Sequence, residues 1–284
     1  MGLFFSSDRF TRPGPGVRPD APRKKGVARL AEIMGRDMWN FFRAGFLAFL
    51  GCLPFIIGMF FAVETHALLF MLLAGIIGGL IAGPELSAMA DTVLRSLRDE
   101  PGYWWETYRR VWKRNARESL VPGMLTGLVL SMQIFTLFHM SVISAGIVTW
   151  VLLILSFVVT LGLESYIWPQ IALLDLPLYG ILKNSLLLFL GYLPRSLGAI
   201  AIKAVYWGAI LLFFPLTTII LPFTNFWLPM LPALLCIYQP LNKCFTIEST
   251  INKMREDELN AALAKDNEPL PEDPTEKAEE SLSL

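Results

Sequence analysis

Six long apolar stretches most strongly restrict what this chain can fold into. Each holds about 20 mostly uncharged residues, the length that an α-helix needs to cross the hydrocarbon core of a bilayer. They are Trp39–Ala62, Ala67–Leu86, Leu120–Met140, Ile143–Ile171, Ala204–Pro222 and Phe226–Phe245. Composition agrees, since 54% of the 284 residues are hydrophobic and only 17% are charged. This excludes a soluble enzyme and predicts an all-α, polytopic membrane helical bundle with six transmembrane helices.

One further apolar stretch, Ser185–Ile202, is not assigned to a span. Pro194 and Arg195 lie in its middle, and an arginine at the bilayer centre costs about 2.5–3.5 kcal/mol on insertion scales. We expect the stretch to lie at the membrane surface or to be partly re-entrant and to lead into the fifth span. A cytoplasmic amphipathic helix is predicted at about 178–194. A seventh span is the alternative.

The distribution of lysine and arginine predicts the orientation. The loops at about 63–66, 140–143 and 222–226 contain neither residue, and all 24 basic residues fall in the other segments. Because short cytoplasmic loops are enriched in Lys and Arg, both termini are predicted to be cytoplasmic.

Three parts follow from this pattern. Residues 1–37 form a cytoplasmic basic arm and a short helix, residues 38–247 form the membrane domain, and residues 248–284 form a cytoplasmic helix and an acidic tail. The tail is rich in acids and proline, so we expect it to be disordered. The formal net charge of zero gives no indication of nucleic-acid binding, and the oligomeric state stays open.

The segment 103–117, YWWETYRRVWKRNAR, has the clearest amphipathic pattern. At helical spacing its aromatic side chains fall on one face and its basic side chains on the opposite face. The candidate contact residues are Trp104, Tyr108, Arg109, Arg110, Trp112, Lys113 and Arg114. This pattern is typical of an interfacial helix whose cations meet anionic lipid headgroups. A linker helix packed on the spans and a docking surface for an acidic partner are the alternatives.

Three ionisable residues near the inner ends of spans are candidates for a polar cavity. Ionisable residues in spans are costly and often functional. Glu85 follows Pro84 in the second span, Glu164 precedes Pro169 in the fourth, and Lys203 begins the fifth. One interpretation is an inward-facing cavity in which Lys203 pairs with a glutamate. The other is that all three only shape helix packing at the inner interface.

No arrangement typical of an enzyme occurs in the sequence, such as HExxH, a P-loop or a Ser/His/Asp set. We therefore predict no catalytic residue, no cofactor and no metal site. His66 and His139 fall at the outer surface near Glu64, but their spacing does not require a metal ion. The three cysteines lie in or beside spans and are predicted to be packing residues without a disulfide.

Four features of the first ~120 residues belong together. They are the opening MGLFFSSDRFTRPGPGVRPDAPRKKG, Leu53-Pro54 late in the first span, Gly83-Pro84-x-x-x-Ala88, and the aromatic-basic run Trp104–Ser119. As a set they resemble the YesL-like family of bacterial integral membrane proteins, a domain of unknown function. The resemblance implies a bacterial cytoplasmic-membrane protein without an established activity. Members of the family are often associated with sugar uptake, which implies an accessory role there.

Two hypotheses on function follow. The first is a non-enzymatic accessory or scaffold component associated with carbohydrate uptake, whose partners are anionic lipids and a membrane transporter subunit. The second is a small-solute transporter or channel with an inward-facing polar cavity.

Overall fold

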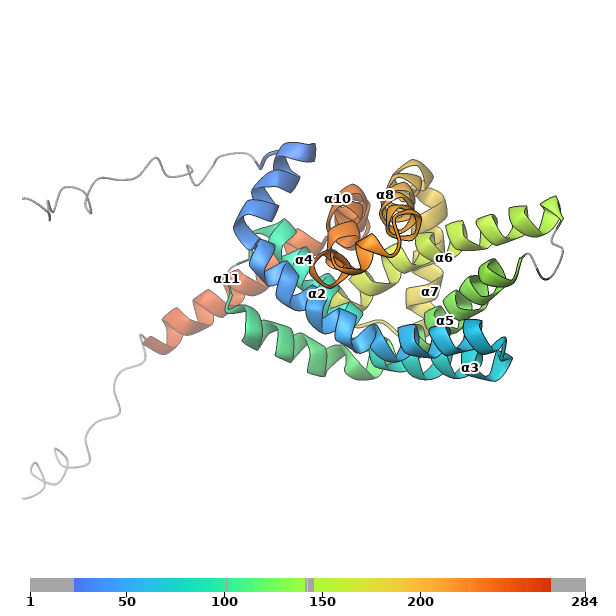
Figure 1. Ribbon diagram of the computed structural model, residues 1–284. Coiled ribbons are helices and arrows are strands. Elements are labelled where there is room, and N and C mark those ends of the chain that lie inside the picture. Colours follow the sequence, from blue (N-terminus) through green and yellow to red (C-terminus); the bar gives the residue numbers. More distant parts are fainter. Residues whose placement is uncertain (1–22, 101, 141, 143–145, 267–284) are drawn as a thin grey trace, which may run out of the picture.

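The computed structural model describes residues 23–266 apart from 101, 141 and 143–145, and Figure 1 shows their arrangement. These residues form helices and turns, with no strand among them. The elements are α2 (Gly26–Thr65), α3 (Leu68–Leu73), the π-helical turn η1 (Ala74–Gly78), α4 (Gly79–Arg98), α5 (Trp104–His139), α6 (Ile147–Leu173), α7 (Leu178–Gly191), α8 (Leu193–Leu212), the 3₁₀ turn η2 (Leu216–Thr218), α9 (Leu221–Thr224), α10 (Trp227–Phe245) and α11 (Ile247–Asp266).

Six helical segments of the described chain are long and apolar enough to cross a membrane. They are Gly26–Thr65, Leu68–Arg98, Trp104–His139, Ile147–Leu173, Leu193–Leu212 and Leu221–Phe245. The prediction of an all-helical chain with six span-length apolar helices is therefore confirmed. In the second segment α3 continues through η1 into α4, so a π-helical turn, which is frequent at functional positions, interrupts that helix.

The fifth span differs from the prediction. The sequence predicts it at 204–222, whereas α8 occupies Leu193–Leu212 and the chain then turns through η2 and α9. The stretch 185–202 is divided between α7 and α8, because α7 ends at Gly191. Arg195 therefore lies exposed in the first turn of α8 and not in the middle of a span.

The amphipathic segment 103–117 is not a separate surface helix. It forms the first part of α5, which continues to His139. The physical reason is local: neither glycine nor proline stands between Arg117 and Leu120, so nothing ends the helix before the span begins. The short helix expected within residues 1–37 likewise continues into the first span as α2.

Small residues bring η1 and α4 into close contact with α5. Gly75, Gly79 and Gly83 recur every four residues on one side, and Ser119, Gly123, Gly127 and Ser131 recur every four residues on the other. A Cβ atom added at Gly79 would overlap the carbonyl group of Gly123, and one added at Gly127 would overlap Gly79. Helices in membranes associate through this kind of close backbone packing.

The helix α4 lies at the centre of the bundle, with α2, α5, α6 and α10 packed around it (Figure 1). Its side chains from Ser87 to Leu94 are buried. The largest buried side chains around it include Phe41 of α2 and Trp168 of α6. In Figure 1, α11 extends away from this bundle.

Two buried hydrogen bonds fix α6 against the helices that follow it. Gln170 Nε2 donates to the Ser185 hydroxyl of α7 over 2.8 Å. Tyr166 and Ser196 of α8 share a hydrogen bond of 2.9 Å between their hydroxyl groups. Such bonds specify which helices pair where the surroundings are apolar.

Candidate functional site

Three arginines converge on the carboxyl end of α4. The last carbonyl groups of a helix have no partner within the helix and need donors from outside. The bonds are Arg36 Nη2 to Ser96 O (2.8 Å), Arg29 Nη2 to Leu97 O (3.0 Å) and Arg23 Nη2 to Arg98 O (3.0 Å). Cations from α2 and from the residues before it therefore cap three successive carbonyls at the negative end of the α4 dipole.

Asp99 is the common partner of these arginines. It follows α4 with a φ of 59°, a left-handed conformation that aspartate tolerates better than most residues. Arg29 Nη2 lies 2.6 Å and Arg23 Nε 3.1 Å from Asp99 Oδ2, and Arg36 binds Oδ1. Partial burial acts to raise the pKa of Asp99, but hydrogen bonds from Arg29 and Arg36 outweigh it, so the pKa lies below its ordinary value.

A second group of ion pairs continues along the same end of α4. Glu100 accepts two bonds from Arg98, from Nε at 2.8 Å and from Nη2 at 3.0 Å. Arg95 Nε donates to the buried Asp91 over 2.7 Å. Each buried charge here has an opposite charge beside it, as the cost of burying ions requires.

The same end of α4 also holds the start of α11. Arg23 Nη1 donates to Glu248 Oε1 over 2.7 Å, and the Tyr238 hydroxyl donates to the same oxygen over 3.0 Å. Asn242 Oδ1 accepts the backbone N–H of Glu248 over 2.9 Å. Arg23, near the beginning of the described chain, therefore joins the start of α11 to the carboxyl end of α4.

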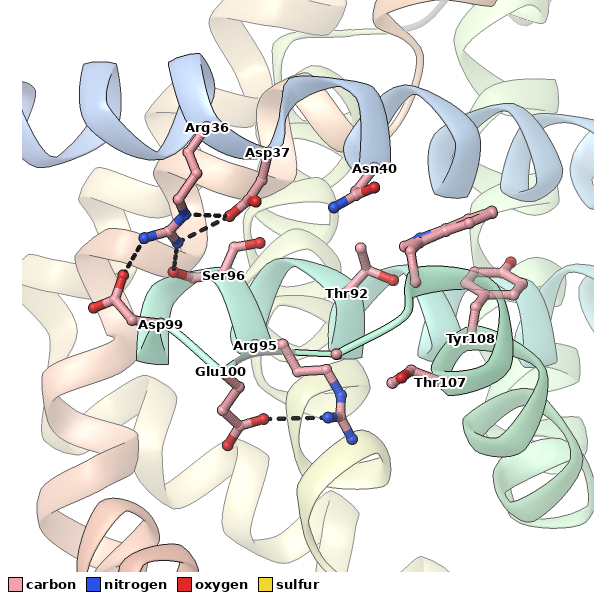
Figure 2. A pocket seen from close by; sticks show the side chains of 12 residues that line it. Arg36, Asp37, Asn40, Thr92, Arg95, Ser96, Asp99, Glu100, Thr107 and Tyr108 are labelled. Carbon is pink, nitrogen blue, oxygen red and sulfur yellow. Dashed lines mark hydrogen bonds and ion pairs between the residues drawn. The ribbon is translucent and has the colours of Figure 1, made fainter. Parts of the chain in front are cut away.

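A polar cavity of about 280 Å³ lies beside this cluster, between α2, α4 and the start of α5. Figure 2 shows Arg36 and Asp99 at one side of it and Tyr108 at the other, with Asn40 of α2 pointing toward Thr92 of α4. The lining carries hydrogen-bond donors and acceptors and charges of both signs. Much of this charge is paired within the lining itself, as in Arg36 with Asp99 and Arg95 with Glu100.

Glu85 fixes the first part of α5 against α4. The Tyr108 hydroxyl donates to Glu85 Oε2 over 2.5 Å, and Trp112 Nε1 donates to Oε1 over 2.9 Å. Gly51 of α2 leaves room for the carboxylate stem, since a Cβ atom there would lie 2.6 Å from Glu85 Cγ. Because Tyr108 and Trp112 are one helical turn apart, both turn toward α4 and the opposite side of α5 points outward.

The outward side of α5 is cationic. Arg109, Arg110, Lys113 and Arg117 are exposed, and we call these four residues the cationic face. Arg114 is different, because its Nη2 donates to the carbonyl of Ala172 in α6 over 2.8 Å.

The aromatic side of the same segment packs against protein. Tyr108 is only 4% exposed, and Trp104 and Trp112 are half-buried against the core. The rings of Trp104 and Tyr108 lie 5.3 Å apart. This is the geometry that a linker helix packed on the spans would have.

Glu164 and Lys203 meet, but Glu85 does not join them. Lys203 Nζ lies 3.9 Å from Glu164 Oε2, and Trp168 Nε1 donates to Glu164 Oε1 over 3.2 Å. Both charged residues line a small cavity with Pro169. Glu85 lines neither this cavity nor the polar cavity beside Asp99, so the three candidates do not share one site.

His66 and His139 are brought together at the other end of α5, with ring nitrogens 2.6 Å apart. No group of three or more His, Cys, Asp or Glu side chains in the described part of the chain is arranged to hold a metal ion.

Two features of the site are absent from the sequence predictions. The glycine series has a recognisable signal, because small residues at four-residue spacing are typical of close helix contacts. Asp99 has none: an acid at the negative end of a helix is ordinarily unfavourable, and only the structure shows the arginines that reverse this. The expected basic arm up to residue 22 and the acidic tail from residue 267 lie outside the described residues.

Comparison of the chain with protein-family models, with curated proteins and with solved structures gives no match.

Proposed function

We propose that this chain is a non-enzymatic membrane protein that serves as an accessory or scaffold component for carbohydrate uptake in the bacterial cytoplasmic membrane. The observation that carries the proposal is the cationic face of α5, held outward by the two bonds between Glu85 and the opposite side of the helix. The helix that carries this face is already formed, so a partner need not pay for ordering its backbone, and its charge is complementary to an acidic partner. The resemblance to the YesL-like family supports the association with sugar uptake.

The placement of charge supports an orientation with both termini in the cytoplasm. Arg23, Arg29 and Arg36 gather at the carboxyl end of α4, near the start of α5. The loops around His66 and Val142, at the other end of α5, contain neither Lys nor Arg. One end of the bundle is thus suited to the cytoplasmic side and to anionic headgroups.

The proposal is tested by purification from native membranes after mild crosslinking. We expect a membrane transporter subunit to copurify with the wild-type protein. Replacing Arg109, Arg110, Lys113 and Arg117 by glutamine removes the cationic face and should reduce the recovered subunit at least about tenfold, since close interfacial charge pairs contribute 1.5 kcal/mol or more. Arg114 is left unchanged because it binds Ala172.

A matched control removes the same charge elsewhere. Lys183, Arg195, Lys243 and Lys253 are also exposed, and their replacement by glutamine should leave the partner bound. Equal loss in both variants would mean that charge acts through general attraction to anionic lipid, and it would contradict a docking face on α5. Recovery of no transporter subunit with the wild-type protein would also contradict the proposal.

The polar cavity beside Asp99 favours the alternative of a small-solute transporter. Asn40 and Thr107 both line the cavity. Under that alternative Asn40→Leu and Thr107→Val would abolish solute uptake by cells, while loss of the cationic face would not affect uptake. The accessory proposal predicts the reverse. Uptake should fall when the cationic face is removed, and the two cavity variants should still bind the partner.

A further inference from the structure

The chain contains only two histidines, and the structure places them in direct contact. His66 Nδ1 and His139 Nε2 lie 2.6 Å apart although 73 residues separate them in the sequence. The rings meet edge to face, with centroids 4.9 Å apart. The pair joins the turn between α2 and α3 to the last turn of α5.

His139 is held in one orientation. It is 7% exposed, its ring stacks on Phe135 with centroids 4.0 Å apart, and its Nδ1 lies 2.8 Å from the Phe135 carbonyl. A carbonyl oxygen only accepts, so Nδ1 carries the hydrogen and Nε2 presents its lone pair to His66. An imidazole whose other nitrogen donates to a backbone carbonyl is the usual arrangement of a metal-binding histidine.

His66 is the adjustable member of the pair. It is exposed and ends α2 with a φ of 53°. No Lys or Arg occurs in the neighbouring loops at 63–66 and 140–143, while Glu64 is exposed two residues away. The neighbouring loops therefore add no basic side chain that would repel a cation.

We propose that His66 Nδ1 and His139 Nε2 bind one divalent transition-metal ion of the class that prefers imidazole, such as Cu²⁺ or Zn²⁺. Metal–nitrogen bonds of about 2.0–2.1 Å place two ligand nitrogens roughly 3 Å apart, so the two nitrogens must separate from their 2.6 Å contact and the exposed His66 ring must turn until both lone pairs point at the ion. Since no third His, Cys, Asp or Glu of the described chain completes the set, water fills the remaining positions.

The proton balance of binding is simple. Without metal, the hydrogen between the rings belongs to His66 Nδ1, because His139 Nε2 is the acceptor. When the ion binds Nδ1, His66 carries its hydrogen on Nε2, so this hydrogen moves between the two nitrogens of one ring. The bound ion then links the α2–α3 turn to α5.

The test is a Cu²⁺ titration of the full chain in lipid nanodiscs, prepared without a polyhistidine tag and with Cys244→Ser to remove the exposed thiol. We expect one ion per chain and an electron paramagnetic resonance spectrum with hyperfine coupling to two imidazole nitrogens. Because there are no other histidines, that coupling reports only this pair.

Variants decide the outcome. His66→Ala removes an exposed side chain, so the fold should persist, and we expect it to weaken binding at least about tenfold and to leave coupling to one nitrogen. His139→Ala should do the same if it folds. Unchanged binding in His66→Ala, or no saturable binding by the wild-type chain, would overturn the proposal and leave a pair held by a hydrogen bond alone.

Discussion

At the scale of single residues, Asp99 is the residue at which three arginines meet. Its carboxylate binds three guanidinium groups that at the same time cap Ser96, Leu97 and Arg98. Removing its charge leaves the three arginines with their carbonyl partners and with one other acid each, namely Glu248 for Arg23, Glu32 for Arg29 and Asp37 for Arg36. Asp99 therefore holds α2 to α4 through charge as well as through hydrogen bonds.

We predict that Asp99→Asn lowers the free energy of unfolding by about 1–2 kcal/mol, between values typical of exposed ion pairs and of hydrogen bonds to charged groups. Thermal unfolding in detergent measures this. Asp257→Asn is the control, because it removes the same charge from an exposed side chain of α11, and it should unfold like the wild type. Equal stability of Asp99→Asn and the wild type would show that the carbonyl groups and the other acids hold the arginines without the charge of Asp99.

The lowered pKa of Asp99 predicts the pH dependence of this difference. The unfolded chain has an ordinary aspartate pKa of about 3.9, and the folded value lies below it. The stabilisation is therefore fully present above the unfolded value and is lost as pH falls through the folded value. We expect the gap between wild type and Asp99→Asn to be constant from about pH 7 to 5 and to close below about pH 4. A gap that persists at the lowest pH would argue against the charge.

At the scale of elements, the contact between α4 and α5 positions the site. Glu85 reaches Tyr108 and Trp112 only because the two helices approach closely along their small residues. The same approach places the start of α5 beside the polar cavity.

We predict that Gly79→Ala lowers the free energy of unfolding by about 1–3 kcal/mol, as expected for overpacking, because the new Cβ overlaps the backbone of Gly123. Gly198→Ala is the matched control: it lies in a helix, and a Cβ there meets no atom within 4 Å. It should be neutral or slightly stabilising. Denaturant titration compares the two, and equal effects would mean that the close approach contributes nothing.

How far sequence predicts these elements depends on what determines each one. The six apolar helices follow from length and hydropathy alone, and the structure has them. The limits of α8 do not follow from length and hydropathy. The apolar sequence around Arg195 is compatible with an arginine at the start of a helix and with one in the middle of a span, so it does not show where the helix begins. The grouping of Glu164 with Lys203, and not with Glu85, depends on which helices are neighbours, which hydropathy does not specify.

At the scale of the whole molecule, the two ends of the bundle differ in chemistry. One end carries the arginines around Asp99, the contact of Arg23 with Glu248, and the cationic face of α5. The other carries the histidine pair and loops without Lys or Arg. The proposed function requires the first end to face the cytoplasm, where a partner can reach it.

Cysteine labelling from one side of the membrane tests this requirement most directly. In a Cys244→Ser background, Glu64→Cys and Glu106→Cys place exposed thiols at the two ends, and a membrane-impermeant maleimide is added to intact cells. We predict that Glu64→Cys is labelled at once and Glu106→Cys only after permeabilisation. The Cys244→Ser chain without either substitution measures background labelling. Labelling of Glu106→Cys in intact cells would place the cationic face outside and contradict the proposed function.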